Sequence, residues 1–482
     1  MLKKKRRFIS STTGVIDTRS EIIQESRAFV ESNKGFKCEK QGYASPRISS
    51  EFMDCSLPMT FDHYSSCSLG CLYCFAYYFK STNPSFNSEL HSINTKKVID
   101  MIRGKASDTR GRVFHKHFVE RRFVLHWGGL ADPFCNFERV NREGYKLLEI
   151  LAAEKYPTLF SFKGNTIFEK DYIKLFEQAS KNKNFAFQVS LVTADDELAK
   201  YVEIGVPSPS RRIEALGLLS DMGYYTILRL RPFIIGVSDE SLDELLERCR
   251  KAGIKGVSME FFAMDARTSQ GMRTRYDWLA KVMGIKKLNE YFKSLSPSER
   301  GGYMRLNRLV KEEFIKKIYT FCIKHGITFG CSDPDFKELN TSGSCCALPE
   351  KYKSNPEMQN FSKNQLTYHL KEARKLFHKT GEKKIIRFDE VFPTTETFMD
   401  DAWLTNDHVS VTNMANCDRQ NNTYRTIAQK HWNNLRSPAN PRNYFHGKIE
   451  PIGIDANGNL KYIYVPMDYE ERWKDEGIKL TK

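Results

Sequence analysis

Three cysteines lie close together early in the chain, within the stretch "CSLGCLYCFAYYF". Cys67, Cys71 and Cys74 follow the spacing C-x3-C-x2-C, and no fourth cysteine follows at a matching distance. Thiols gathered this tightly can form a disulfide, bind zinc, hold an iron–sulfur cluster or be neighbours by chance. Each alternative makes a different demand on the rest of the chain.

Composition argues against the disulfide. The chain opens with the charged stretch "MLKKKRRFISSTTG" and has no run near the roughly 18 apolar residues that a membrane helix needs. We therefore expect a cytoplasmic protein without a membrane partner. In that reducing compartment, twelve cysteines act more often as metal ligands, catalytic groups or core residues than as disulfides.

The missing fourth cysteine separates zinc from an iron–sulfur cluster. A structural zinc usually takes four ligands, and the next cysteine along the chain is the distant Cys135. A [4Fe–4S] cluster held by three thiolates leaves one iron open for a substrate or cofactor. S-adenosylmethionine (SAM) can bind that iron through its amino and carboxylate groups, where reductive cleavage gives a 5′-deoxyadenosyl radical.

Apolar strands alternate with amphipathic helices after the cysteine cluster. We expect a strand just before Cys67 and further strands at 121–127, 158–164, 185–193, 224–234 and 256–262. Helices are expected near 140–154, 169–182, 210–222 and 240–252, the third with Ser210 as its N-cap. Strands of nearly continuous apolar content between helices predict a parallel sheet, and six such units predict a partial (β/α)6 barrel of the α/β class.

In such barrels, chemistry is found on loops at the carboxyl ends of the strands. The cysteine loop would follow the first strand and "GGLADPF" the second. Lys163 would end the third strand, Ser190 the fourth and residues 229–232 the fifth. The pattern therefore predicts that these residues converge on one edge of the sheet.

The cysteine motif, with Tyr73 before its last cysteine, resembles the signature of the radical SAM superfamily. The stretches "GGLADPF", "FSFKGNTIFEKDYIKLF" and "VEIGVPSPSRRIEALGLLSDMGYYTILRLRPFIIG" resemble its branch related to spore photoproduct lyase, over roughly residues 55–240. The resemblance implies a TIM-like partial barrel, a [4Fe–4S] cluster, SAM, and an electron donor such as flavodoxin or ferredoxin.

The resemblance also implies roles for single residues. Cys67, Cys71 and Cys74 would bind the cluster, and Tyr73 would lie against the adenine of SAM. The remaining cofactor contacts would come from Gly128 and Gly129 at the amino group, Lys163 and Ser190 at the methionyl or ribose portion, and Asp132 at the family's aspartate. Each residue also has a structural alternative, such as a turn or a surface lysine, and Glu203 and Arg211 are expected to fix the loop before the next helix.

One departure from the family bears on the reaction. Spore photoproduct lyases have a hydrogen-donor cysteine two residues before that aspartate, where this chain has Leu130. Cys135 is a candidate for a shifted donor, although a small buried residue is its more common role. We therefore expect a relative of the lyases and not a spore photoproduct lyase itself.

A second group of cysteines follows in "ITFGCSDPDFKELNTSGSCCALPE". Cys331, Cys345 and Cys346 are candidates for an auxiliary [4Fe–4S] cluster or a zinc site. A fourth ligand would come from Cys322, Cys417 or His325. The alternative is that these are ordinary buried thiols.

The chain carries 75 Lys and Arg against 59 Asp and Glu, a net charge of +16, with a pI near 9.1. This excess favours a nucleic-acid substrate held by phosphate contacts. We expect these contacts from Lys3 to Arg7 and from Arg267 to Arg308, with Trp278 or Tyr303 stacking on bases. A peptide or small-molecule substrate is the alternative, and a zinc-containing nucleic-acid-binding protein without catalysis is the more remote one.

Four regions are expected: a basic extension (1–50), the partial barrel (51–265), a basic helical segment that completes it (266–330), and an α+β C-terminal region (331–482). Asn457-Gly458 predicts a β-hairpin in the last region. Trp403, Trp432, Tyr444 and Phe445 are expected to form a small core there or to bind substrate. In the basic segment, aromatic residues interleave with Lys and Arg, which suits stacking on bases, and the alternative is that they form the core faces of two helices; they are Tyr276, Trp278, Tyr291, Phe292 and Tyr303.

Overall fold

The computed structural model describes residues 38, 40–42, 45–48, 54–76, 90–265, 270–295, 298–300, 303–349, 365–393 and 424–480. The predictions for Lys3 to Arg7, Arg267, Trp403 and Cys417 lie outside these residues.

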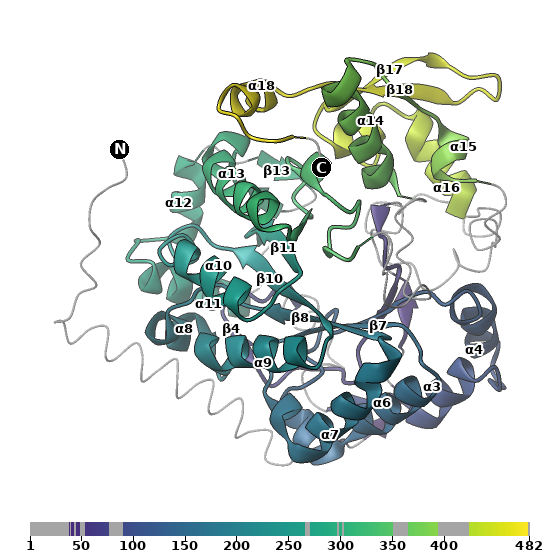
Figure 1. Ribbon diagram of the computed structural model, residues 1–482, viewed down its shortest axis with the longest axis vertical. Coiled ribbons are helices and arrows are strands. Elements are labelled where there is room, and N and C mark those ends of the chain that lie inside the picture. The colour runs from purple at the N-terminus through teal and green to yellow at the C-terminus, as the bar shows by residue number, and fades with distance from the viewer. Residues whose placement is uncertain are drawn as a thin grey trace.

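A parallel sheet organises the centre of the molecule (Figure 1). Its parallel strands follow sequence order: β3 (Met59–Phe61), β6 (Leu125–Trp127), β7 (Thr158–Phe162), β8 (Phe185–Ser190), β10 (Tyr225–Phe233), β11 (Gly256–Phe261) and β15 (Thr328–Cys331). β2 (Arg47–Ile48) adds an antiparallel edge beside β3. The α/β class is confirmed, with one parallel strand more than the six predicted. Between the described edge strands, β15 and β2, no pairing closes the sheet into a barrel.

The expected helices are present and cover one face of this sheet. They are α5 (Asn136–Asn141), α6 (Glu143–Ala153), α7 (Lys170–Ala179), α9 (Pro209–Asp221), α10 (Leu242–Lys251) and α13 (Arg308–His325). The N-cap of α9 is Ser208 and not Ser210, and the Ser208 side chain accepts a hydrogen bond from the Arg211 amide. Pro209 follows at the first helical position, where its fixed φ suits helix entry and its missing N–H costs nothing.

The two faces of the sheet differ in chemistry. Side chains that alternate toward the helices form the main apolar core, among them Phe160, Phe187, Leu228 and Met259. The opposite face, called the inner face below, carries Ser190, Arg229, Ser258 and Gly330, which lie directly opposite one another on β8, β10, β11 and β15. The inner face is therefore the polar one.

Shorter elements border the carboxyl edge of the sheet. β4 (Gly70–Cys71) pairs with β9 (Glu203–Ile204), which follows α8 (Asp196–Val202). α11 (Gln270–Val282), α12 (Leu288–Ser294) and the small sheet of β12 (Met264–Asp265), β14 (Tyr303–Arg305) and β13 (Ser298–Arg300) lie beyond β11. The chain between β3 and β6 contains α3 (Thr95–Ile102), α4 (Thr109–Phe114) and β5 (His91–Ser92). β5 pairs with β1 (Lys40–Gln41).

The C-terminal region packs onto α13 and contains the predicted hairpin. β17 (Ile449–Ile454) and β18 (Leu460–Tyr464) are antiparallel around Asn457-Gly458, and β16 (Ile385–Ile386) joins β18. α14 (Leu366–Thr380), α15 (Phe388–Val391), α16 (Tyr424–Asn433), α17 (Pro441–Tyr444) and α18 (Asp468–Asp475) surround them, at the top of Figure 1. Trp432 and Phe445 are fully buried, which confirms them as core residues.

No helix among the described residues is both long enough and apolar enough to span a membrane.

Candidate active site

The three clustered cysteines lie on one loop that is fixed at its centre. Cys71 pairs with Glu203 across the β4–β9 bridge, and the Leu72 amide donates to the carbonyl of Val202 at 3.0 Å. From α11, the Arg275 guanidinium donates to the Cys71 carbonyl at 3.0 Å. Elements far apart in the chain therefore bracket Cys71, which is buried, while Cys67 and Cys74 are partly exposed.

A buried charge network lies beneath Cys71. Arg212 of α9 forms an ion pair with Glu203, and the Tyr73 hydroxyl donates to the same carboxylate. Burial opposes ionisation of Glu203, but the charges of Arg212 and Lys163 outweigh it and lower its pKa. Glu203 is therefore an anion that joins the cysteine loop to α9.

Lys163 lies at the edge of this network. Its ammonium is 3.9 Å from Glu203 Oε1 and 5.1 Å from the centre of the Tyr73 ring. Burial raises the pKa of Cys71 to about 12, and the charge of Lys163 acts in the opposite direction. Lys163 thus lies where it favours a thiolate, and it is not an ordinary surface lysine.

Asp132 positions the loop that carries Lys163. Its carboxylate accepts hydrogen bonds from three backbone amides, those of Lys163, Gly164 and Phe134. The sequence resemblance assigned Asp132 to the cofactor, and the structure gives it a part in joining the loops after β6 and β7.

Gly128 and Gly129 begin the loop after β6. Gly128 has φ +103°, and a Cβ there would lie 2.1 Å from the Ser161 carbonyl oxygen, so only glycine fits. Gly129 is less constrained, because its nearest neighbour would be Asp62 Oδ2 at 3.7 Å. The turn alone therefore explains why residue 128 is glycine. This is the structural alternative to a contact with the amino group of SAM.

The loop after β3, which leads to Cys67, is held by buried polar groups. Asp62 Oδ1 accepts from the amides of Leu130 and Ala131 at 2.9 and 2.8 Å. His63 Nε2 donates to Glu138 at 3.0 Å and its Nδ1 accepts from Trp127 Nε1 at 2.9 Å. These bonds tie the first two strand-end loops into one support for the cysteines.

Cys135 is a direct neighbour of this loop. It is buried at the start of α5, in the apolar cluster that Cys67 also contacts. Burial alone would raise the pKa of Cys135, but hydrogen bonds from the Cys67 thiol and from the amides of Ser68 and Phe137 lower it. This position supports the Cys67 side of the loop and gives no support to a hydrogen donor on the inner face.

The sequence-predicted residues are therefore brought together. Ser190 ends β8, opposite Arg229 in the neighbouring strand, and its carbonyl accepts from Arg212 at 2.5 Å. Lys163 follows the end of β7. The cysteine loop lies beside Lys163 and Ser190. Arg212 is the main residue that sequence reasoning missed, since it singled out Arg211. Arg211 is partly exposed on α9 and pairs with Glu214.

The donor set fits a three-thiolate cluster. The thiols of Cys67 and Cys74 are near enough to raise the pKa of Cys71, and the cations Lys163 and Arg275 are close by. No group of three His, Cys, Asp or Glu in the described part of the chain surrounds a single metal ion. A four-iron cluster does not need such a group, because its thiolates bind different irons and lie farther apart than the ligands of one ion.

The second set of cysteines does not assemble as predicted. Cys331 points from β15 into the apolar core on the helix side of the sheet. Cys345 and Cys346 lie in the loop 342–348 against the inner face, where Gln188 Nε2 donates to the Cys346 carbonyl at 2.7 Å. The sheet separates the thiols because adjacent strand residues face opposite sides, so a metal held by all three has no support from the structure.

The alternative fourth ligands do not change this result. Cys322 is buried in the same apolar core as Cys331, and His325 is exposed at the end of α13. Among the described cysteines, Cys55 lies near Cys345 and Cys346. It packs against the same small apolar cluster.

Several aromatic residues of the basic segment pack in the apolar core beside the cysteine loop. Tyr276 and Phe292 are buried in the apolar cluster that also contains Cys71 and Tyr73, and Trp278 and Tyr291 pack against it. Tyr303 is half-buried on β14. The segment therefore covers the cysteine loop, and stacking by Trp278 or Tyr303 stays a prediction.

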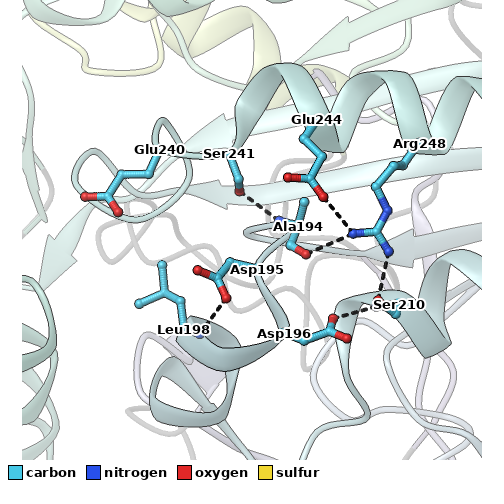
Figure 2. Close-up of a pocket in the computed structure, with 9 residues that line it drawn as sticks. All are labelled: Ala194, Asp195, Asp196, Leu198, Ser210, Glu240, Ser241, Glu244 and Arg248. Atoms are coloured by element: carbon cyan, nitrogen blue, oxygen red, sulfur yellow. Dashed lines mark hydrogen bonds and ion pairs between the residues drawn. The ribbon is translucent and has the colours of Figure 1, made fainter. Parts of the chain in front are cut away.

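A surface pocket of about 520 Å³ lies between α8, α9 and α10 (Figure 2). Its carboxylates include Asp195, which caps α8, and Glu244, which pairs with Arg248 at 3.0 Å. Arg248 also donates to the Ala194 carbonyl and to Ser210 Oγ. These groups join three helices and the cysteines are not among the lining residues, so we do not assign the reaction to this pocket.

Comparisons with known proteins do not define a family. No protein-family model matches the chain. Over 205 residues, or 42% of the chain, it is 26% identical to the uncharacterized proteins Rv2578c of Mycobacterium tuberculosis and Mb2609c of Mycobacterium bovis. The match spans 57% of the length of these relatives.

Solved structures give weak likenesses. A spore photoproduct lyase variant with bound AdoMet and dinucleoside spore photoproduct has a TM-score of 0.45 and 11% identity, covering 61% of this chain and 80% of its own. SuiB of Streptococcus suis, bound to the precursor peptide SuiA, has a TM-score of 0.37 and 13% identity, covering 66% and 62%. These values define neither fold nor activity for this chain, so both must follow from its own residues.

Proposed function

We propose that this protein is a radical SAM enzyme that acts on nucleic acid. The observation that carries the proposal is the position of the C-x3-C-x2-C loop. Its three thiols lie at the carboxyl edge of a parallel sheet in sequential order, beside Lys163 and Ser190 at the ends of neighbouring strands. In α/β barrels this is the edge where chemistry takes place.

Cys67, Cys71 and Cys74 would hold a [4Fe–4S] cluster. When bound there, the cluster and SAM would supply a 5′-deoxyadenosyl radical after one-electron reduction by a donor such as flavodoxin or ferredoxin. The residues of this chain have other tasks. Glu203 and Arg212 fix the cysteine loop on α9, and Lys163 offers a cation beside it.

The inner face would orient the substrate through its row of polar side chains. His126 Nε2 donates to Ser161 Oγ at 2.8 Å, and Ser161 Oγ donates to Gln188 Oε1 at 2.7 Å. Burial, followed by the charges of Arg229 and Arg231, lowers the pKa of His126 to about 3, so this imidazole is neutral. A neutral, hydrogen-bonded row can hold a polar base or sugar without supplying a proton near a radical.

The nucleic-acid substrate class rests on charge. The net charge of +16 favours a polyanion. Contacts to phosphates release counterions, so affinity should fall steeply as salt rises. A reaction on a base would also require that base to leave the stack, which favours single-stranded or looped substrates over duplex.

The enzyme assignment is tested by anaerobic reconstitution of the full chain. The wild type should bind iron and sulfide, show an EPR signal that SAM alters, and form 5′-deoxyadenosine with dithionite. The Cys67→Ala, Cys71→Ala, Cys74→Ala triple variant should do none of these, and Cys249→Ala, a buried cysteine of α10, should match the wild type. Colourless protein with stoichiometric zinc would instead support the non-catalytic alternative.

The substrate class needs a separate titration. Single-stranded DNA, RNA and duplex DNA are compared at low and moderate salt by fluorescence anisotropy. The proposal expects tighter binding to single strands and weaker binding as salt rises. Weak binding of all three at low salt would move the proposal to a peptide or small-molecule substrate.

A further inference from the structure

Two arginines stand on the inner face of β10, one strand away from the candidate SAM residues. Arg229 is directly opposite Ser190 on one side and Ser258 on the other. Arg231 follows two positions later, and strand alternation places it on the same face. Both guanidinium groups are half-buried, so each costs desolvation energy unless it meets a negative charge.

The charge of Arg231 has partners in the protein. Its guanidinium donates to the Cys345 carbonyl, and the Cys345 thiol and Glu260 lie close enough to raise its pKa. Hydrogen bonding from Cys346, together with Arg231 and Lys337, lowers the pKa of Cys345 to about 5, so Cys345 is an anion at neutral pH. Arg231 is therefore matched by a thiolate and a carboxylate.

Arg229 is not matched in this way. Within the described residues its side chain makes one hydrogen bond, to the neutral Gln188 Oε1 at 3.3 Å, and no ion pair. Burial and then the neighbouring Arg231 lower its pKa to about 10, and the more weakly acting charges of Cys346, Glu260 and Cys345 do not offset them. The surroundings of Arg229 thus disfavour its charge, whereas those of Arg231 favour it.

From this contrast we infer that Arg229, with Arg231 beside it, forms an anion subsite on the inner face that binds one phosphodiester of the substrate. The inference deepens the proposed function and rests on it for the position of the substrate. Guanidinium groups suit this role because they donate parallel hydrogen bonds to two phosphate oxygens.

SAM is not the anion that this subsite requires. Its sulfonium is a cation, and in the proposed complex its single carboxylate, with its amino group, would be bound to iron. Glu260 is also engaged, since it accepts from Ser332 Oγ at 2.6 Å and is 3.9 Å from Arg305. Because no described carboxylate forms an ion pair with Arg229, we expect its anionic partner to be a bound molecule other than SAM.

The test compares a phosphodiester with an uncharged analogue of the same shape. Full-length reconstituted protein with SAM is titrated by calorimetry with the deoxydinucleotide d(ApA) and with its methylphosphonate analogue, which keeps the shape and lacks the charge. The wild type should bind the phosphodiester about tenfold more tightly, the value of one charge-assisted hydrogen bond. In Arg229→Gln that difference should fall to near one.

Arg250→Gln is the matched control, because Arg250 is a partly exposed arginine on α10, away from the inner face, and pairs with Glu247. It removes the same charge and should keep the tenfold difference. Equal binding of the two probes by the wild type, or an undiminished difference in Arg229→Gln, would overturn the inference. Loss of SAM binding in Arg229→Gln would also overturn it, by placing Arg229 at the cofactor.

Failure of the proposed function gives a different result. If the reconstituted protein never cleaves SAM but still prefers the phosphodiester through Arg229, the anion subsite stands and the radical chemistry does not. If SAM is cleaved and neither probe binds, the subsite is wrong and the cofactor assignment stands.

Discussion

The two groups of cysteines differ in how their thiols are positioned. Cys67, Cys71 and Cys74 belong to one loop, so their spacing in the chain already limits how far apart they can be. Cys331 belongs to a strand, and the alternation of that strand turns it away from Cys345 and Cys346. Close spacing therefore keeps thiols together when one loop carries them, and gives no such guarantee when a strand of a sheet carries one of them.

The largest effect expected from this difference is on metal content. Cys74→Ala should remove the cluster and reduce 5′-deoxyadenosine formation to background, because two thiolates hold four irons poorly. Cys346→Ala should keep the iron content of the wild type. Iron and sulfide assays on both variants make the comparison, and loss of iron in Cys346→Ala alone would reverse the roles of the two groups.

A second expected effect concerns the ion pair beneath the first group. Arg212→Met leaves the buried Glu203 without its guanidinium and should lower the free energy of unfolding by about 3–5 kcal/mol. Urea denaturation of the cluster-free protein measures this. Adding Glu203→Gln should restore much of the loss, and a double variant as unstable as Arg212→Met would show that packing, not charge, sets the cost.

The second group should differ from the first in its response to pH. The pKa of Cys345 is about 5 in the fold, below the ordinary thiol value of 9.0, so the thiolate is present at neutral pH. Its contribution to stability is complete above the unfolded pKa and is lost as pH falls through about 5. Iodoacetamide labelling of Cys345, followed by peptide mass spectrometry, should stay nearly constant from pH 8 to 6. In Cys346→Ala it should decline over that range.

The smallest expected effect is at Cys331. Cys331→Ala removes one buried sulfur from the apolar core and should cost about 1 kcal/mol in unfolding free energy. Metal content should not change. A loss of bound iron or zinc in this variant would show that the strand cysteine is a ligand after all.

Much of the fold follows from local patterns in the sequence. The strands from β6 to β11 are runs of apolar residues bounded by helices, and the Asn457-Gly458 turn fixes the C-terminal hairpin. β15 was not counted among the strands of the sheet because it has only four residues and follows β11 after a long stretch of chain. Its place next to β11 depends on α13, which arrives after a long insertion.

The site was predictable only where the chain is locally constrained. The cysteine loop, Lys163 and Ser190 could be placed because each follows a recognisable strand. Arg212 could not, since a charged residue next to Arg211 gives no sign of which one turns inward. A signal was present, however: Arg212 lies on the buried stripe of α9, one turn before Ala215 and Leu216.

The hydrogen bond from Arg275 to the Cys71 carbonyl also bears on when the site forms during synthesis. The two residues are 204 positions apart in the chain. At common elongation rates of about 5–20 residues per second, roughly 10–40 s pass between their emergence from the ribosome. During that interval the cysteine loop lacks its cover from α11. The three thiols are therefore accessible on the nascent chain, to an oxidant for example, before α11 packs over their loop.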